Sequence, residues 1–258
     1  AQIADFASSS GDRLASIAGA KPISGVTQDL TRRNCGILAE NRGAGWYQSY
    51  GALAACSQLL FLIEYNSFNS QSKIGMGVTE KPSGEGSETE ITGATTNLGN
   101  ASGEVINTNG FSCVSYRGEE NLWANIFKWV DGINVYPYNQ HELFIADHNF
   151  TENKNDGHYK NAGITVAKAN GYISAFAYNE EYDWLFFPSE VLGDSALPVG
   201  DSFYQNAAHA SSFLTALLGG NWGNGAVAGL FCWSLSSAPS YRYRGIGGRL
   251  AYVPPGLV

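Results

Sequence analysis

The sequence predicts an α+β fold, in which helices and strands occupy separate parts of the chain. Helical patterns lie in the first half, strand and turn patterns dominate after residue 133, and no pattern recurs at a fixed period. Domains with separated helices and strands belong to the α+β class, whereas regular alternation would indicate a parallel α/β sheet. The 258 residues are enough to bury a sizeable core.

The first two segments predict a connection and a helix. Residues 1–30 are rich in Ala, Ser and Gly and predict an N-terminal arm or linker segment, which leaves 31–258 as one domain. Within residues 44–68 apolar residues recur at near-helical spacing, and neither Pro nor Gly follows Gly51. These apolar residues are Leu53, Leu60 and Ile63. We therefore expect a helix in this segment.

The middle of the chain predicts long loops, a strand and a second helix. Residues 75–110 carry few apolar side chains, which is typical of loops, and residues 111–116 favour a strand. After a turn at Gly118, four apolar residues at i, i+3, i+4 and i+7 share one helical face. The four are Trp123, Ile126, Phe127 and Val130. The acidic residues 119–120 suit the start of such a helix, and Asp-Gly at 131–132 suits its end.

The second half of the chain predicts strands joined by turns. Residues 163–179 favour two strands joined by an Asn-Gly turn. A Gly-rich loop at 219–229 precedes a strand at 230–235, and a final strand covers 246–253. We expect these C-terminal strands to lie in one sheet against which the second helix packs.

The chain contains four cysteines, Cys35, Cys56, Cys113 and Cys232. None of them forms a C-x-x-C pair, which excludes a zinc knuckle and a thioredoxin motif. Three disulfide pairings are open to four cysteines, and the spacing does not choose among them. We favour free and mostly buried thiols.

Charge and hydropathy exclude two classes of partner. The net charge is −8 and no basic stripe is present, so we expect no nucleic acid partner. The longest apolar run, at 59–65, is too short to span a bilayer, so we expect no membrane insertion.

Motifs for catalysis and metal binding are weak. Two Gly-Asp-Ser triplets, at 193–195 and 200–202, lack a following Asp-x-x-His and are interpreted as turns; no G-x-S-x-G elbow exists. The polar segment 146–159 has neither the H-x-x-x-H spacing nor an EF-hand register, and is interpreted as a hairpin. We therefore expect no enzymatic activity, no cofactor and no metal site.

The strand near the C-terminus separates large from small residues, because successive side chains point to opposite faces. One face carries Phe231, Trp233 and Leu235, and the other carries Cys232, Ser234 and Ser236. We expect the first set in the core and the second on the surface. The same period recurs in Tyr241, Tyr243 and Gly245.

The segment GGNWGNGAVAGLFCWSLSSAPSYRYRGIGGRL resembles the C-terminal variable region of diversity-generating retroelement target proteins. These are phage receptor-binding and microbial surface-display proteins, and the resemblance covers roughly 31–252. It implies a C-type lectin-like fold of the formylglycine-generating-enzyme-like subtype. Such a fold has a mixed antiparallel sheet, two helices and long loops, with a variable region at about 219–250. Its frame residues, expected to be buried, are Trp123, Phe127, Trp222, Phe231 and Trp233.

The resemblance also implies which residues vary and bind ligand. In that family a reverse transcriptase miscopies template adenines, so that Asn codons become codons for many other residues. The residues found where a template Asn is expected are Gly223, Val227, Cys232, Ser234, Ser236, Ser237, Tyr241, Tyr243 and Gly245. Several of these positions also follow from the alternation of the strand, and we expect binding to centre on the two tyrosines.

The resemblance implies a hypervariable receptor-recognition protein, encoded by a phage or prophage. We expect a protein or glycan on a bacterial cell surface as its partner, and a location on a virion tail or outside the cell. A homo-oligomer could form through an upstream region. The alternatives are a structural virion protein, or a lectin of fixed specificity, although E-P-N and Q-P-D sugar motifs are absent. Oxidases of the same fold need a C-terminal cysteine pair, where this chain has only Cys232.

Overall fold

The computed structural model of the protein describes residues 10–23, 30–82, 88–136, 141–150, 157–206 and 213–256. In these ranges the helices are α1 (Arg32–Glu40), α2 (Gly51–Tyr65) and α3 (Ser70–Lys73), with 3-10 turns η1 (Thr96–Leu98), η2 (Glu180–Tyr182) and η3 (Gly225–Val227). The strands of the first half are β1 (Trp46–Gln48), β2 (Gly103–Ile106), β3 (Ser112–Tyr116), β4 (Glu119–Glu120) and β5 (Phe127–Tyr136). Those that follow are β6 (Glu142–Ile145), β7 (Lys160–Thr165), β8 (Gly171–Tyr172), β9 (Ala175–Phe176), β10 (Pro188–Glu190), β11 (Ser202–Gln205), β12 (Leu214–Leu218), β13 (Trp233–Ser237), β14 (Ile246–Gly247) and β15 (Leu250–Tyr252).

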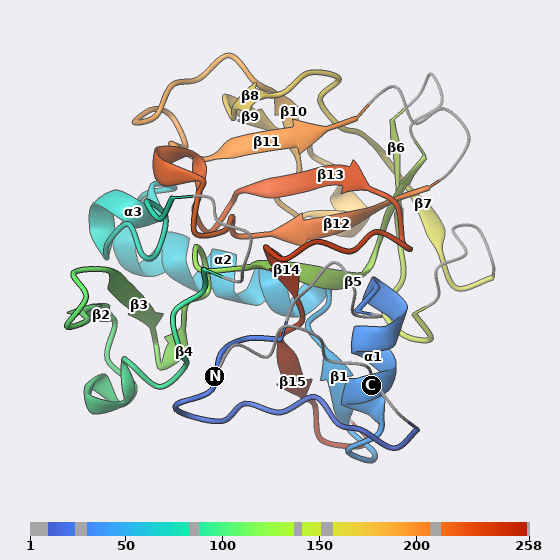
Figure 1. Cartoon of the computed structure of the whole chain (residues 1–258). Coiled ribbons are helices and arrows are strands. Elements are labelled where there is room, and N and C mark those ends of the chain that lie inside the picture. Colours follow the sequence, from blue (N-terminus) through green and yellow to red (C-terminus); the bar gives the residue numbers. More distant parts are fainter. Residues whose placement is uncertain are drawn as a thin grey trace.

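A mixed sheet forms the centre of the described part of the chain (Figure 1). Its strands lie in the order β7-β6-β5-β12-β13-β11-β8, and β14 pairs with β5. Most neighbouring strands are antiparallel, but β11 runs parallel to β13 and β14 runs parallel to β5. Smaller sheets pair β1 with β15, β9 with β10, and β3 with both β2 and β4. The predicted α+β class is confirmed.

Two hydrophobic clusters pack against this sheet from opposite faces. The larger contains Phe61 of α2 and Trp233 of β13, and the smaller contains Leu38 of α1 and Trp129 of β5. The neighbouring residues Trp129 and Val130 belong to different clusters, as expected when successive side chains of a strand alternate. The sheet is therefore buried on both faces along β5.

Helix α2 confirms the core of the helix predicted within 44–68. At its start, a Cβ on Gly51 would lie only 2.9 Å from Cδ1 of Ile133, so glycine lets the helix begin close against β5. Leu60 and Ile63 helped to define the predicted helical spacing, but both are exposed, whereas Phe61 is fully buried. The helix was therefore predicted correctly, although part of its apolar face points to solvent.

The helix predicted over 119–131 is wrong, because this segment forms the short strand β4, a bend and the first half of the central strand β5. Its backbone leaves helical geometry at residues with positive φ, namely Asn121 (+50°), Ala124 (+62°) and Asn125 (+58°). β5 lies between β6 and β12 and is covered on both faces, so nearly all of its residues are buried. Apolar residues at this spacing match a helical and a buried-strand pattern equally well. The predicted burial of Trp123 and Phe127 is confirmed.

The hairpin predicted over 163–179 is also wrong. β7 pairs with β6, whereas β8 pairs with β11 and β9 pairs with β10. The Asn170 side chain accepts a hydrogen bond from the backbone N–H of Gln205 (2.7 Å), which ties the expected turn to β11. These long-range pairings replace the local one.

Two other expectations concern the loops and the N-terminal segment. The predicted strand at 111–116 is confirmed as β3, and the predicted loops at 75–110 are interrupted by η1 and by β2, which pairs with β3. Residues 10–23 of the predicted arm lie against the domain. The backbone N–H of Leu14 donates to the carbonyl of Leu38 (2.8 Å), and that of Gly19 donates to the carbonyl of Thr92 (2.7 Å).

The four cysteines are free, and all but Cys56 are buried, which confirms the interpretation favoured from the sequence. Cys35 and Cys232 belong to the smaller hydrophobic cluster. Among the described residues, none of the helices combines the length and the apolar content needed to cross a bilayer.

Candidate ligand-binding surface

The structure divides the nine predicted ligand-binding residues by exposure. The exposed ones are Gly223, Tyr241 and Tyr243, and the partly exposed ones are Val227 and Ser236. The buried ones are Cys232, Ser234, Ser237 and Gly245. Since a buried side chain cannot contact a partner directly, the predicted surface is smaller than the sequence indicated.

The predicted exposure of one face of β13 is wrong. Cys232, just before the strand, packs in the smaller hydrophobic cluster, and Ser234 is buried with its hydroxyl 2.9 Å from the hydroxyl of Ser236. β13 has strands on both sides, β11 and β12, and it also has a buried layer on its second face. Ser237 and Gly245 are buried as well, so the display predicted for them is wrong. The core assignment of the large residues Phe231, Trp233 and Leu235 is confirmed.

The exposed tyrosines lie on residues 238–245, here called the tyrosine loop, between β13 and β14. Tyr241 is 46% exposed and Tyr243 is 44% exposed. Three backbone hydrogen bonds hold this loop: Tyr241 N–H to Ala238 O (2.9 Å), Ile246 N–H to Tyr243 O (3.0 Å) and Phe127 N–H to Gly245 O (2.9 Å). The last of these joins the end of the loop to the central strand β5, so the side chains extend from an anchored backbone.

The tyrosine loop contacts the Gly-rich loop at 219–229. A Cβ on Gly245 would lie 2.6 Å from Nδ2 of Asn221 and 3.2 Å from Cε1 of Tyr243, so a larger residue here would require the Asn221 side chain to shift. The Asn221 side chain also accepts from the backbone N–H of Gly223 (3.0 Å). Gly223 and Gly245 therefore both border Asn221, which places the exposed Gly223 beside the end of the tyrosine loop.

Trp222 anchors the Gly-rich loop, as the sequence predicted. Its side chain is buried with Val78 and Cys113 in a third hydrophobic cluster. Its carbonyl accepts from the backbone N–H of Lys81 (2.8 Å). The loop is thus joined to residues 78–81 by side chain and backbone, which fixes the position of the adjacent surface.

Asp201 supports the start of β13, and sequence reasoning missed this role. Its carboxylate is buried and accepts from the backbone N–H of Phe231 (2.7 Å). Burial raises the pKa of this carboxyl well above its ordinary value, an effect opposed by backbone N–H groups of Phe231 and Cys232. Asp201 belongs to the second Gly-Asp-Ser triplet, which had been interpreted as a turn. The triplet gave no sign of a partner thirty residues away.

The raised pKa of Asp201 predicts an unusual dependence of stability on pH. The folded protein holds this proton more tightly than the unfolded chain, so the contribution of Asp201 to stability decreases as pH rises from about 4 towards neutral. Relative to Asp201→Asn, whose amide does not titrate, the parent protein should lose stability over this range. Urea unfolding at several pH values measures the difference.

Asp194, in the first triplet, is the matched control for this pH experiment. It is exposed and accepts from the backbone N–H groups of Ala196 and Leu197 (both 2.8 Å), which lower its pKa and confirm the predicted turn. A lowered pKa gives the opposite sign and a lower window, so the parent should lose stability relative to Asp194→Asn only as pH falls below about 4, with almost no slope from there to neutral. Equal slopes for the two comparisons would contradict the assigned role of Asp201.

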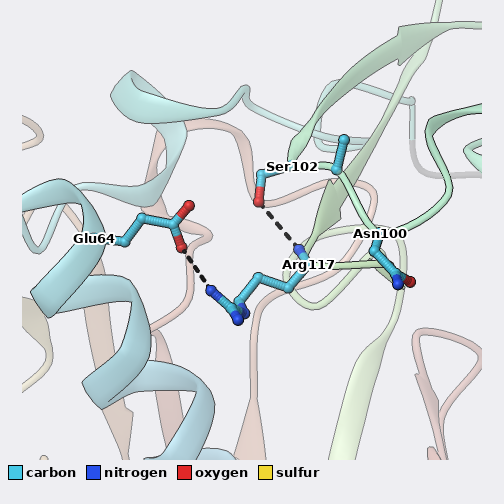
Figure 2. Close-up of a pocket in the computed structure, with 5 residues that line it drawn as sticks. Glu64, Asn100, Ser102 and Arg117 are labelled. Atoms are coloured by element: carbon cyan, nitrogen blue, oxygen red, sulfur yellow. Dashed lines mark hydrogen bonds and ion pairs between the residues drawn. The ribbon is translucent and has the colours of Figure 1, made fainter.

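A polar hollow of about 410 Å³ lies between α2 and the small sheet of β2, β3 and β4, within the 75–110 region and its surroundings (Figure 2). Figure 2 shows Glu64 paired with the guanidinium of Arg117 (3.5 Å), and the backbone N–H of Arg117 donating to Ser102 (3.1 Å). The hydroxyl of Tyr116 also donates to Glu64 (3.1 Å). The charged groups of the hollow already satisfy one another, so it is a weaker candidate than the tyrosine loop.

Within 146–159, the side chains of Asp147, His148 and His158 are described and exposed. The His148 ring hydrogen-bonds to Asp147 and lies 5.1 Å from the ring of His158, measured between centroids. Glu152 and Asp156, which belong to the expected hairpin, lie outside the described residues. Among the residues that are described, no three His, Cys, Asp or Glu side chains are placed to hold a metal ion.

No protein-family model and no curated protein matches the chain. What the surface can do therefore follows from its own side chains. Tyrosine combines a large contact area with a hydroxyl group and few rotatable bonds, so it loses little entropy on binding. Two tyrosines on an anchored loop are suited to recognising another molecule.

Proposed function

We propose that the protein binds a ligand on a bacterial cell surface through the tyrosine loop. The pair of exposed tyrosines, Tyr241 and Tyr243, on a loop with fixed ends is the observation that carries this proposal. The partner is a protein or a glycan, and the protein acts on a phage tail or on a cell surface. It belongs to the proteins diversified by retroelements, as the motifs at 219–250 suggest.

We further propose that the domain has the C-type lectin-like fold of those proteins. The pair of helices α1 and α2 and the mixed sheet support this assignment. The positions that vary freely are then Gly223, Val227, Ser236, Tyr241 and Tyr243, which have some exposure. Variation at the buried positions Cys232, Ser234, Ser237 and Gly245 is restricted to residues that fit the available space.

An anchored loop favours this function for an energetic reason. A mobile loop loses conformational freedom when it binds, and this loss reduces the affinity. In the tyrosine loop the backbone is already ordered by its turn hydrogen bonds and by its link to β5. Side chains can therefore be exchanged while the backbone that presents them is kept.

Replacing both tyrosines by serine tests the proposal. Interface tyrosines commonly contribute about 2 kcal/mol or more when they are hot spots, so Tyr241→Ser/Tyr243→Ser should weaken binding by at least about thirtyfold. The parent protein is first screened against a panel of bacterial cells and a glycan array to identify a target. Retention of the parent and of the variant on that target is then compared. Because both side chains are exposed, the melting temperature should stay nearly constant.

Tyr178→Ser is the matched control, because Tyr178 is exposed but lies far along the chain from the loop, beside η2. This variant should bind as the parent does. A folded double variant that still binds with parental affinity would contradict the proposal and direct attention to the polar hollow of Glu64 and Arg117. A parent protein that binds no cell or glycan would instead favour a structural virion protein.

A further inference from the structure

A cavity of about 370 Å³ lies between α2 and the central sheet, and none of its lining residues belongs to the tyrosine loop. Figure 1 shows α2 running alongside β5, the strand with which β14 pairs. Most of the cavity wall is aliphatic, formed by Leu53, Leu60, Leu122, Val130, Leu218 and Leu230. Pockets of this size that are mainly apolar and contain a few polar groups are typical small-molecule sites.

The polar group deepest in this wall is the amine of Lys128. The residue is buried, and its Nζ donates to the carbonyls of Ala124 (3.0 Å) and Leu122 (3.4 Å). In its charged ammonium form Lys128 has three N–H donors, and two of them have these acceptors among the described residues. Burial, together with the charge of Arg249, lowers the pKa of Lys128 well below its ordinary value. An anion placed beside the amine would supply a further acceptor and an opposite charge.

A second cation, more exposed than Lys128, belongs to the same wall. Arg249 also lines the wall; it is partly exposed, donates to the carbonyl of Glu120, and has its Nη1 3.8 Å from the carboxylate of Glu119. Glu119 is itself about half exposed, so its attraction for the arginine is screened by water. Glu119 lines the cavity as well, so a carboxylate bound inside would meet the two cations together with this half-exposed acid.

We propose that this cavity binds an amphipathic monocarboxylate, with its apolar chain among the leucines and its carboxylate between Lys128 and Arg249. A buried carboxylate is stable only when it is paired and hydrogen-bonded, and the two cations meet that requirement. An apolar cavity of about 150 Å³ holds one benzene, so 370 Å³ accommodates roughly fifteen non-hydrogen atoms. Medium-chain fatty acids are of this size.

Comparing octanoate, 1-octanol and acetate shows whether the cavity recognises the apolar chain, the carboxylate or both. Isothermal titration of the whole protein should show binding of octanoate. Octanol has the chain without the charge and should bind at least about tenfold more weakly, and acetate, which lacks the chain, should not bind. Failure of octanoate to bind, or equal affinity for octanol, would overturn the proposal.

Cys56 provides an independent readout at the cavity wall. It is the exposed cysteine, whereas Cys35, Cys113 and Cys232 are buried. It lines the same cavity. Octanoate should slow the alkylation of Cys56 by a maleimide, and acetate at the same concentration should leave the rate unchanged. A rate unaffected by octanoate would count against the proposed location.

Two substitutions test the site, one at the buried amine of Lys128 and one at the partly exposed Ser57 of α2. Lys128→Met keeps the length of the side chain and removes the amine, and should weaken octanoate binding at least about tenfold while leaving octanol binding unchanged. Ser57→Trp, on a partly exposed position of α2 that lines the cavity, should block both ligands. Lys160→Met, an exposed cation on β7, is the control and should bind octanoate normally.

These variants keep the proposal falsifiable even if one of them folds poorly. Should Lys128→Met fail to fold, Ser57→Trp still tests where octanoate binds, because a substitution at a partly exposed position disturbs the fold less. Unchanged octanoate affinity in a folded Ser57→Trp or Lys128→Met variant would overturn the proposed site. Neither outcome depends on the tyrosine loop, so the two proposals can fail separately.

Discussion

Replacing Trp233 by alanine is expected to lower the free energy of unfolding by about 3–5 kcal/mol, because a large buried aromatic is lost and a cavity is left. The Trp233 side chain is fully buried, and its ring stacks on Phe187 with centroids 4.4 Å apart. Its indole N–H donates to the carbonyl of Phe186 (2.8 Å), which would lose its partner. Urea unfolding followed by circular dichroism measures the change.

Tyr243→Ala is the control for this experiment. It also removes an aromatic ring near β13, but from a position that is 44% exposed, so its effect should stay within about 0.5 kcal/mol. A much larger loss of stability for Trp233→Ala than for Tyr243→Ala would show that Trp233 belongs to the buried core and that Tyr243 does not. Equal losses would show that the tyrosine loop is part of the packed core, and would remove the basis of the proposed function.

Gly229→Ala is expected to be the most damaging single-methyl change near the binding surface, costing at least about 3 kcal/mol. A Cβ on Gly229 would lie 2.0 Å from Oδ1 and 2.3 Å from Oδ2 of Asp201, which no small adjustment can relieve. The carboxylate would have to move and would lose its hydrogen bond from Phe231. Backbone strain contributes little, since Gly229 is not among the residues with positive φ.

A double-mutant cycle distinguishes this clash from general intolerance of the position. Asp201→Ala alone should cost about 1–3 kcal/mol, because the buried N–H of Phe231 loses its acceptor. In the Gly229→Ala background the same change removes the obstacle, so the double variant should be more stable than Gly229→Ala by about 1 kcal/mol or more. Additive losses would mean that Gly229 is required for another reason.

The errors over 119–131 and around β13 have one physical origin. Local periodicity reports which residues are apolar, but it does not report how many layers cover them. Over 119–131 the apolar spacing fitted a helix, yet the segment enters the middle of a sheet with a hydrophobic cluster on each side. On β13 the small residues Cys232 and Ser234 indicated a solvent face, yet that face is also covered.

The successes concern features that are local in the sequence. The spacing of apolar residues located α2, the strand at 111–116 formed as β3, and the large residues of β13 are in the core. The tyrosine loop was predicted to be exposed, and both of its tyrosines are. Its role in binding stays a prediction, to be tested by the tyrosine-to-serine variants.

The sequence by itself determined the α+β class, the buried aromatic frame and the exposed Tyr-rich turn, because each depends on residue type and near-neighbour spacing. The tertiary structure alone decided which face of β13 is hidden, how Asp201 supports Phe231 thirty residues later, and that Lys128 lies in the wall of an apolar cavity. Those features depend on strand order and on contacts between distant segments. A pattern read along one segment carries no information about the layer that will cover it.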